Sequence, residues 1–72
     1  MSTKKKFLYW KEAEKSDGTL VTFSIFKKGN SIFIENEAGY EHLMHPSANS
    51  VDDEIRIVFS AKVTKTIMPH TA

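Results

Sequence analysis

Apolar side chains recur at every second position on both sides of a short polar loop between Thr19 and Glu35. The apolar positions are Val21, Phe23, Ile25, Ile32 and Ile34, and the loop consists of Lys27, Lys28, Gly29 and Asn30. A connecting loop with an even number of residues places all five apolar side chains on one face of an antiparallel pair, whereas a three-residue loop scatters them over both faces. The pattern therefore predicts a β-hairpin and nearly defines its register.

Another strand is expected before this hairpin, from Phe7 to Glu14, followed by the turn residues Ser16, Asp17 and Gly18. A two-residue Asp17-Gly18 turn would pair Trp10 with Ile25. Both hairpin registers then place their alternating apolar residues on the same face of the sheet. This agreement predicts a three-stranded meander with one core face. That face is expected to hold Leu8, Trp10, Val21, Phe23, Ile25, Ile32 and Ile34.

Turn residues from Asn36 to Gly39 indicate a third turn, after which Tyr40–Met44 can return as a short fourth strand. The segment from His45 to Asp53 contains Pro46 and several small polar residues, which favours a surface loop.

The C-terminal segment from Glu54 to Met68 supports two interpretations. Its apolar residues alternate and many are β-branched, which favours a long strand with a bend near Ser60 and Ala61. A helix at about 51–63 is the alternative, because Ser50 followed by Asp53 resembles a capping box. The strand is the preferred interpretation here.

The 72 residues form one domain, with a flexible basic lead at 1–6, a β-rich domain at 7–68 and a loose tail at 69–72. The fold class is all-β, or β-rich α+β. We expect a small antiparallel sheet of about four or five strands that curls into an SH3/OB-like barrel.

The predicted register also places aromatic side chains on the second face of the meander. These are Phe7, Tyr9, Phe26 and Phe33, to which Tyr40, His42 and Met44 can be added. One explanation is that the sheet curls or is covered, so that these residues join the core. The other is a stacking platform for unpaired bases, flanked by Lys11, Lys27 and Lys28.

The charge pattern argues against nucleic acid as the first choice. The net charge is only +1, glutamates are interspersed in the same strands, and Arg56 is the only arginine. The glycine-and-aromatic motifs of cold-shock and other OB-type proteins are absent. Without cysteine, a signal-like apolar run or a stretch of membrane-spanning length, the chain is expected to be cytoplasmic and to have no membrane association.

Catalytic and metal-binding patterns are weak. His42, His45 and His70 are the only imidazole ligands, and their spacing does not predict a shared metal site. No glycine-rich phosphate loop or nucleophile motif is present. We therefore expect neither an enzyme nor a bound cofactor or metal, and no small-molecule substrate.

The first functional hypothesis is a non-catalytic protein-interaction module, such as an accessory subunit, inhibitor or regulator. Its anchors would be aromatic side chains on the second face, or an open edge of the first or last strand that pairs with another protein or with a second copy as a homodimer. The candidate anchors are Tyr9, Phe26, Phe33 and Tyr40. The alternative is a barrel that binds single-stranded nucleic acid, with Tyr9, Phe26 and Phe33 stacking and lysines 4–6, Lys27 and Lys28 contacting phosphates.

Overall fold

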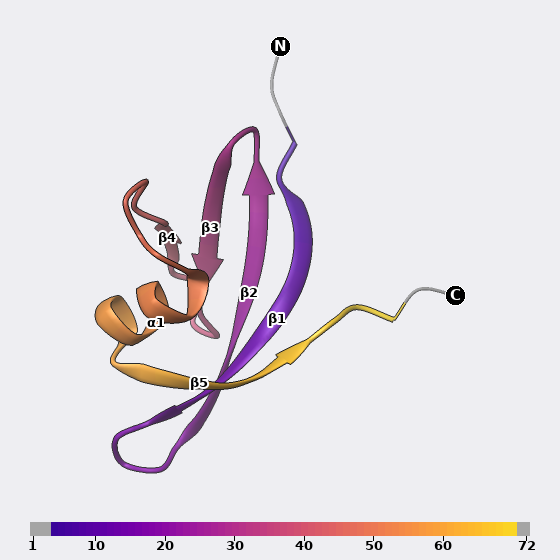
Figure 1. Ribbon diagram of the computed structural model, residues 1–72. Helices are drawn as coiled ribbons and strands as arrows, with labels where there is room; N and C mark the ends of the chain where they lie inside the picture. Colours follow the sequence, from indigo (N-terminus) through magenta and orange to yellow (C-terminus); the bar gives the residue numbers. More distant parts are fainter. Residues whose placement is uncertain (1–3, 71–72) are drawn as a thin grey trace.

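A computed structural model describes residues 4–70 and contains one antiparallel sheet and one short helix (Figure 1). The elements are β1 (Lys6–Lys15), β2 (Leu20–Lys28), β3 (Ser31–Glu35), β4 (Glu41–Leu43), α1 (Val51–Phe59) and β5 (Ala61–Ile67). The predicted small β-rich fold is therefore confirmed. No helix within residues 4–70 has the length and apolar character needed to cross a membrane.

The five strands follow the order β4-β3-β2-β1-β5, and every neighbouring pair is antiparallel. The sheet is open, so it curls without closing into the expected barrel. Residues 51–59 form a helix, which leaves β5 only seven residues long. The edges are β4 and β5, and β1 lies between β2 and β5. The expectation that the first strand offers a free edge is therefore wrong for residues 10–15, which pair with β5, whereas residues 6–9 have no strand beside them on that side.

The β2–β3 hairpin has the register that the alternation predicts. Lys28 lies opposite Ser31, which leaves a two-residue turn of Gly29 and Asn30. Gly29 has a φ of 61°, in the left-handed region that glycine enters without steric cost. Ile25 then lies opposite Ile34, and the five alternating apolar residues that predicted the hairpin share the core face.

The predicted β1–β2 register is wrong by one residue. Tyr9, and not Trp10, lies opposite Ile25. The loop holds three residues, because the Lys15 N–H donates to the Thr19 carbonyl and the Gly18 N–H donates to the Lys15 carbonyl, both at 2.9 Å. A change from a two-residue to a three-residue loop reverses the face of every β1 side chain that pairs in this register. Trp10 therefore leaves the predicted core face.

The preferred strand over Glu54–Met68 is wrong for residues 54–59, which belong to the helix Val51–Phe59. The Ser50 side chain accepts a hydrogen bond from the Asp53 N–H at 3.1 Å, and acidic residues occupy the first turn. Ser60 ends the helix with a left-handed φ of 55°. The strand prediction is confirmed for Ala61–Ile67, and the predicted bend near Ser60 marks the junction.

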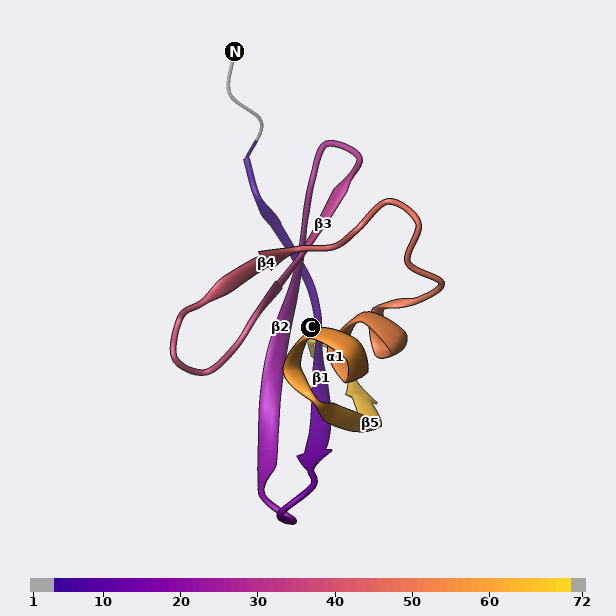
Figure 2. The same ribbon diagram turned by 90° about the vertical axis from the view of Figure 1, so that its left-hand side faces the viewer.

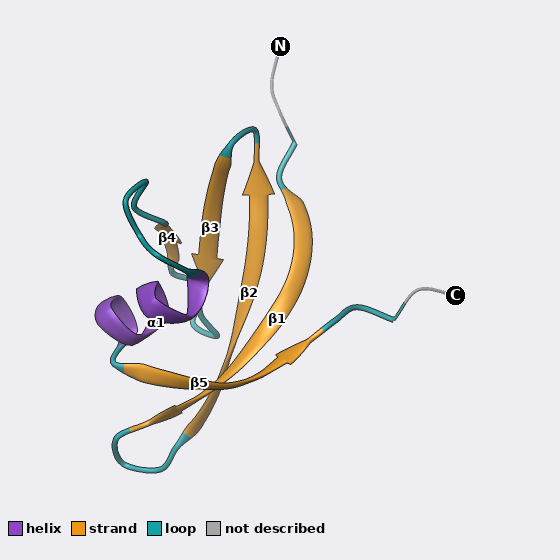
Figure 3. Cartoon of the chain, in the orientation of Figure 1, coloured by secondary structure: helices purple, strands orange, loops and turns teal. Residues whose placement is uncertain are grey.

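The core lies between α1 and one face of the sheet. Among the described residues α1 is the only helix, drawn in purple in Figure 3, and the turned view of Figure 2 places it in front of β1. The buried apolar residues are Ala13, Phe23, Ile25, Ile34, Ile55 and Ala61. Leu8 still packs against this cluster, as does Tyr9. The helix therefore covers one face of the sheet, the core face.

The turn at 36–39 and the fourth strand are present, although the strand is limited to Glu41–Leu43. Asn36 organises this turn, because its side-chain oxygen accepts the N–H groups of Ala38 and Tyr40. The surface loop expected at 45–53 is confirmed only for residues 45–50, because residues 51–53 already belong to α1.

Candidate binding surfaces

Four aromatic side chains cluster on the sheet face opposite the core. Phe7 and Trp10 come from β1, Phe26 from β2 and Phe33 from β3. The ring centroid of Phe7 lies 4.7 Å from that of Trp10 and 5.6 Å from that of Phe26, and Phe26 lies directly opposite Phe33. All four residues are half-buried. We call these four residues the aromatic face.

A β-bulge explains how Phe7 and Trp10 come to share this face. In a regular strand, residues three positions apart point to opposite sides of the sheet. The β1–β2 register shifts between Phe7 and Tyr9, so Leu8 is an additional residue in β1. Phe7 therefore pairs with Phe26, whereas Trp10 pairs with Ser24, and both positions lie on the aromatic face.

The rim of the aromatic face combines apolar and charged groups. Leu43 lies opposite Phe33 and is 53% exposed. Lys5 Nζ lies 4.3 Å from the centroid of the Phe26 ring and forms an ion pair with Glu41. The hydrogen bond to Glu41 raises the pKa of Lys5 above its ordinary value. The rim thus carries charge of both signs.

The structure does not bring all the predicted binding residues together. Phe26 and Phe33 lie side by side on the aromatic face. Tyr9 packs against the core on the other face, because of the one-residue difference in register. Tyr40 is exposed, and its ring centroid lies 6.2 Å from that of Phe59 in α1. A platform built from Tyr9, Phe26 and Phe33 therefore does not form.

The predicted lysines are also separated. Lys11 lies on the helix side, where its Nζ is 2.8 Å from an Asp52 carboxylate oxygen and donates to Thr66 Oγ1 at 2.6 Å. Lys27 and Lys28 are exposed beside the β2–β3 turn. Lys27 lies opposite Ile32, which is on the core face, and Lys28 lies opposite Ser31, which is on the aromatic side. The two lysine side chains therefore point to opposite faces of the sheet.

A buried carboxylate links β4 to α1. Glu54 is 6% exposed, and its Oε2 accepts hydrogen bonds from His42 Nε2 at 2.8 Å and from the His45 N–H at 3.0 Å. The pKa of Glu54 is lowered mainly by the hydrogen bond from His42 and also by the bond from the His45 N–H, whereas burial acts to raise it. Residues 4–70 contain no cluster of three or more histidine, aspartate or glutamate side chains placed to hold a metal ion.

Two further polar contacts stabilise turns. Ser47 Oγ lies 2.7 Å from His45 Nδ1, which also accepts the Ser47 N–H at 3.1 Å. Both residues are exposed and only two positions apart, so the contact closes a local turn. In the β1–β2 loop, the Thr19 N–H donates to Asp17 Oδ1 at 2.9 Å, and this bond lowers the pKa of Asp17.

A second surface lies at the beginning of β2. Because β3 ends at Glu35, opposite Ser24, residues 20–23 have no strand beside them on that side. Glu37 fills part of the gap, since its carboxylate accepts the Thr22 N–H at 3.1 Å. A cleft of about 230 Å³ adjoins this edge. It is lined by Lys15, Val21, Phe23, Phe59 and the turn residues 36–38; we call it the β2-edge cleft.

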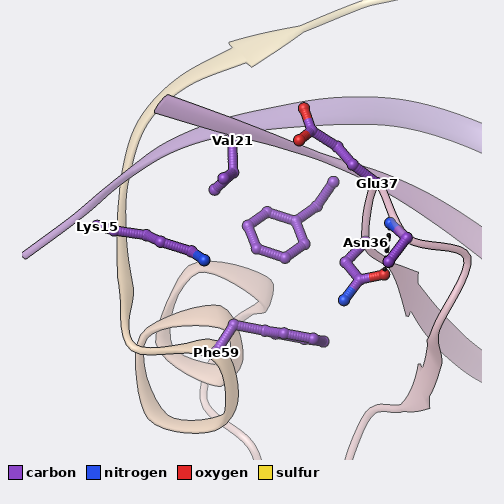
Figure 4. A pocket seen from close by; sticks show the side chains of 7 residues that line it. Lys15, Val21, Asn36, Glu37 and Phe59 are labelled. Carbon is purple, nitrogen blue, oxygen red and sulfur yellow. Dashed lines mark hydrogen bonds between the residues drawn. The ribbon is translucent and has the colours of Figure 1, made fainter. Parts of the chain in front are cut away.

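The β2-edge cleft has an apolar floor with charged groups at its sides (Figure 4). The ring centroids of Phe23 and Phe59 lie 4.8 Å apart, and Phe23 is 2% exposed. Lys15 reaches toward the cleft from the side opposite Asn36 and Glu37. Within the described residues Lys15 takes part in no ion pair.

The sequence-based reasoning missed Trp10 at the aromatic face, and it missed the β2-edge cleft. A signal for Trp10 was present, because Ser16-Asp17-Gly18 also fits a three-residue hairpin loop with glycine in its last, left-handed position. Gly18 indeed has a φ of 87°. The cleft had no such local signal, since it combines residues from β1, β2, α1 and a turn.

Comparison of this chain with protein-family models, with curated proteins and with solved structures finds no match.

Proposed function

We propose that this protein is a non-catalytic interaction module, an accessory subunit or regulator, that binds another protein through its aromatic face. One observation carries the proposal: four aromatic side chains cluster on the sheet face that lacks the helix. The Phe7 ring contacts those of Trp10 and Phe26, and Phe33 lies opposite Phe26 in register. Aromatic side chains dominate the energetics of protein interfaces and are enriched at their centres.

The size of the aromatic face suits the centre of an interface. A standard interface covers about 800 Å² on each partner. That area is larger than the area exposed by four half-buried rings. A partner would therefore also cover Leu43 and the charged rim around Lys5 and Glu41, and an apolar centre with a polar rim is the usual anatomy of such contacts.

Charge favours a protein over a nucleic acid as the partner. Lys5 is paired with Glu41, and Glu35 lies opposite Glu41 in the β3–β4 pair. Lys11 is engaged by Asp52 on the other side of the sheet. A phosphate backbone would meet these carboxylates without a continuous row of free lysines, whereas a protein partner can match a rim of mixed sign.

The test compares the wild-type chain with Phe26→Thr/Phe33→Thr, which removes two facing rings while keeping β-branched residues in the strands. Leu20→Thr is the matched control, because Leu20 is 59% exposed at the far end of β2. Each tagged protein is incubated in an extract of its source cells. The complexes are then sized by chromatography with light scattering at low and high salt.

A salt-resistant protein complex that survives Leu20→Thr and is lost in the double variant supports the proposal. Leu43→Glu should also abolish the complex, and because Leu43 is exposed this change should have little effect on folding stability. Far-UV circular dichroism checks the fold of each variant. Retention of the complex by both aromatic-face variants, or recovery of only salt-released nucleic acid, would reject the proposal.

A further inference from the structure

The β2-edge cleft combines three features that together fit a peptide. It has a strand edge without a neighbouring strand at residues 20–23, an apolar floor of Phe23 and Phe59, and the Lys15 ammonium group at one side. Peptides that add a strand to an open edge obtain affinity from main-chain hydrogen bonds, and alternate side chains enter pockets on one face.

We propose that the β2-edge cleft binds the C-terminal end of an extended peptide from a partner protein. The peptide continues the line of β3 alongside β2, places an apolar side chain over Phe23 and Phe59, and pairs its terminal carboxylate with Lys15. This site is separate from the aromatic face, which lies on the other side of the sheet.

The volume of the cleft limits the ligand to the size of side chains. Pockets that hold small molecules usually measure about 300–1,000 Å³, whereas this cleft measures about 230 Å³. That space accepts one or two aliphatic side chains. The remaining affinity would come from the backbone of β2, which is the arrangement expected for an extended peptide.

The direction of the peptide follows from the direction of the strands. A peptide antiparallel to β2 runs as β3 does, from the Ser24 side toward Leu20. Its C-terminal end then approaches the β1–β2 loop, beside which Lys15 lies with its N–H bonded to the Thr19 carbonyl. Since β2 begins at Leu20, a longer peptide would find no further edge to pair with. A chain end at this point meets the only cation that lines the cleft.

Glu37 acts as an internal competitor in this arrangement. Its carboxylate accepts the Thr22 N–H, the group that an added strand would bind through a backbone carbonyl. The peptide must displace this carboxylate. Removal of the Glu37 side chain should therefore strengthen peptide binding.

The experiment uses the full chain and a tetrapeptide probe, acetyl-Thr-Val-Thr-Val with a free carboxylate, compared with the same peptide carrying a C-terminal amide. Binding is followed by the NMR shifts of the backbone amides. We expect saturable shifts at Leu20, Thr22 and the 36–38 turn with the acid peptide. Binding should weaken about threefold to fivefold with the amide peptide, and by a similar factor for Lys15→Met.

Two variants complete the test. Glu37→Ala should bind the acid peptide more tightly than the wild type does. Phe26→Thr/Phe33→Thr should bind it unchanged, which separates this site from the aromatic face and its proposed function. Equal binding of the acid and amide peptides, no effect of Lys15→Met, or no shift at Leu20 and Thr22 even in Glu37→Ala would each overturn the proposal.

Discussion

Glu54 is the only charged residue among residues 4–70 that is buried, and its environment makes it sensitive to acid. Its carboxylate holds His42 of β4 and the backbone of His45 against α1. The buried carboxylate is satisfied as long as it is ionised, since an ionised carboxylate accepts both bonds. Protonation of this single residue therefore weakens the link between the helix and the fourth strand.

The sign of the pH effect follows from the lowered pKa of Glu54 in the folded state. The stabilisation is fully present above the ordinary glutamate pKa of about 4.3 and is lost as the pH falls through the lower folded value. We expect the urea midpoint of the wild type to fall more between neutral and acidic pH than that of Glu54→Gln. Glu14→Gln, at an exposed position, should keep the wild-type acid response. If the urea midpoint fell equally at acidic pH in the wild type and in Glu54→Gln, Glu54 would not be the source of the acid sensitivity.

At the scale of the element, α1 depends on its two ends because a nine-residue helix is too short to be stable by itself. Ser50 supplies the N-terminal cap through its bond with the Asp53 N–H. Ser60 ends the helix in the left-handed conformation, which is unfavourable for any residue with a Cβ atom.

Substitutions at the two ends should act in opposite directions. Ser50→Ala should lower the free energy of unfolding by about 1 kcal/mol, through loss of the cap. Ser60→Gly should raise it by about 0.5–1 kcal/mol, because relief of the left-handed strain outweighs the added entropy of glycine in the unfolded chain. Urea unfolding followed by circular dichroism measures both changes. A destabilised Ser60→Gly would show that the Ser60 conformation carries little strain.

At the scale of the whole molecule, stability rests on one thin layer between α1 and the sheet. Ile55 is fully buried in this layer, with Phe23, Ile25 and Ile34 from the sheet, whereas Ile57 of the same helix is 65% exposed. A domain of this size has a total stability of only a few kcal/mol. Loss of one central contact can therefore unfold it.

Ile55→Ala and Ile57→Ala form a matched pair of changes in one helix. We expect Ile55→Ala to lower the free energy of unfolding by about 2–5 kcal/mol, through lost burial and the cavity that it leaves. Ile57→Ala should change it by less than about 0.5 kcal/mol. Thermal unfolding monitored by circular dichroism distinguishes them. Similar losses in both variants would mean that α1 packs through a different face.

The open edges of the sheet determine where another strand could be added. β5 is an edge strand, and it carries Lys62 and Lys65, both exposed. Lysines on an edge strand disfavour pairing with a second copy, since two such strands would bring like charges together. The incomplete edge of β2 differs from β5, because its Thr22 N–H, already bonded to Glu37, is a donor that an added strand could bind.

The sequence by itself determined the features that depend on neighbouring residues. The alternation around Gly29 and Asn30 sufficed for the β2–β3 register, because burial of one sheet face penalises every shifted pairing. The turn at 36–39 was likewise predictable from local composition. The aromatic residues Phe26 and Phe33 followed as neighbours once that register was known.

Only the tertiary structure decided the features in which two local solutions were close in energy. The sequence Ser16-Asp17-Gly18 is compatible with a two-residue or a three-residue hairpin loop. The observed three-residue loop places Trp10 on the aromatic face and Tyr9 on the core face. Residues 54–59 could form a strand or a helix, and the observed helix has its Ser50 cap and buries Ile55 against the sheet. The β2-edge cleft arose from the same packing, because Phe59 meets Phe23 only when the helix lies on the sheet. Such contacts join distant residues, so no local pattern encodes them.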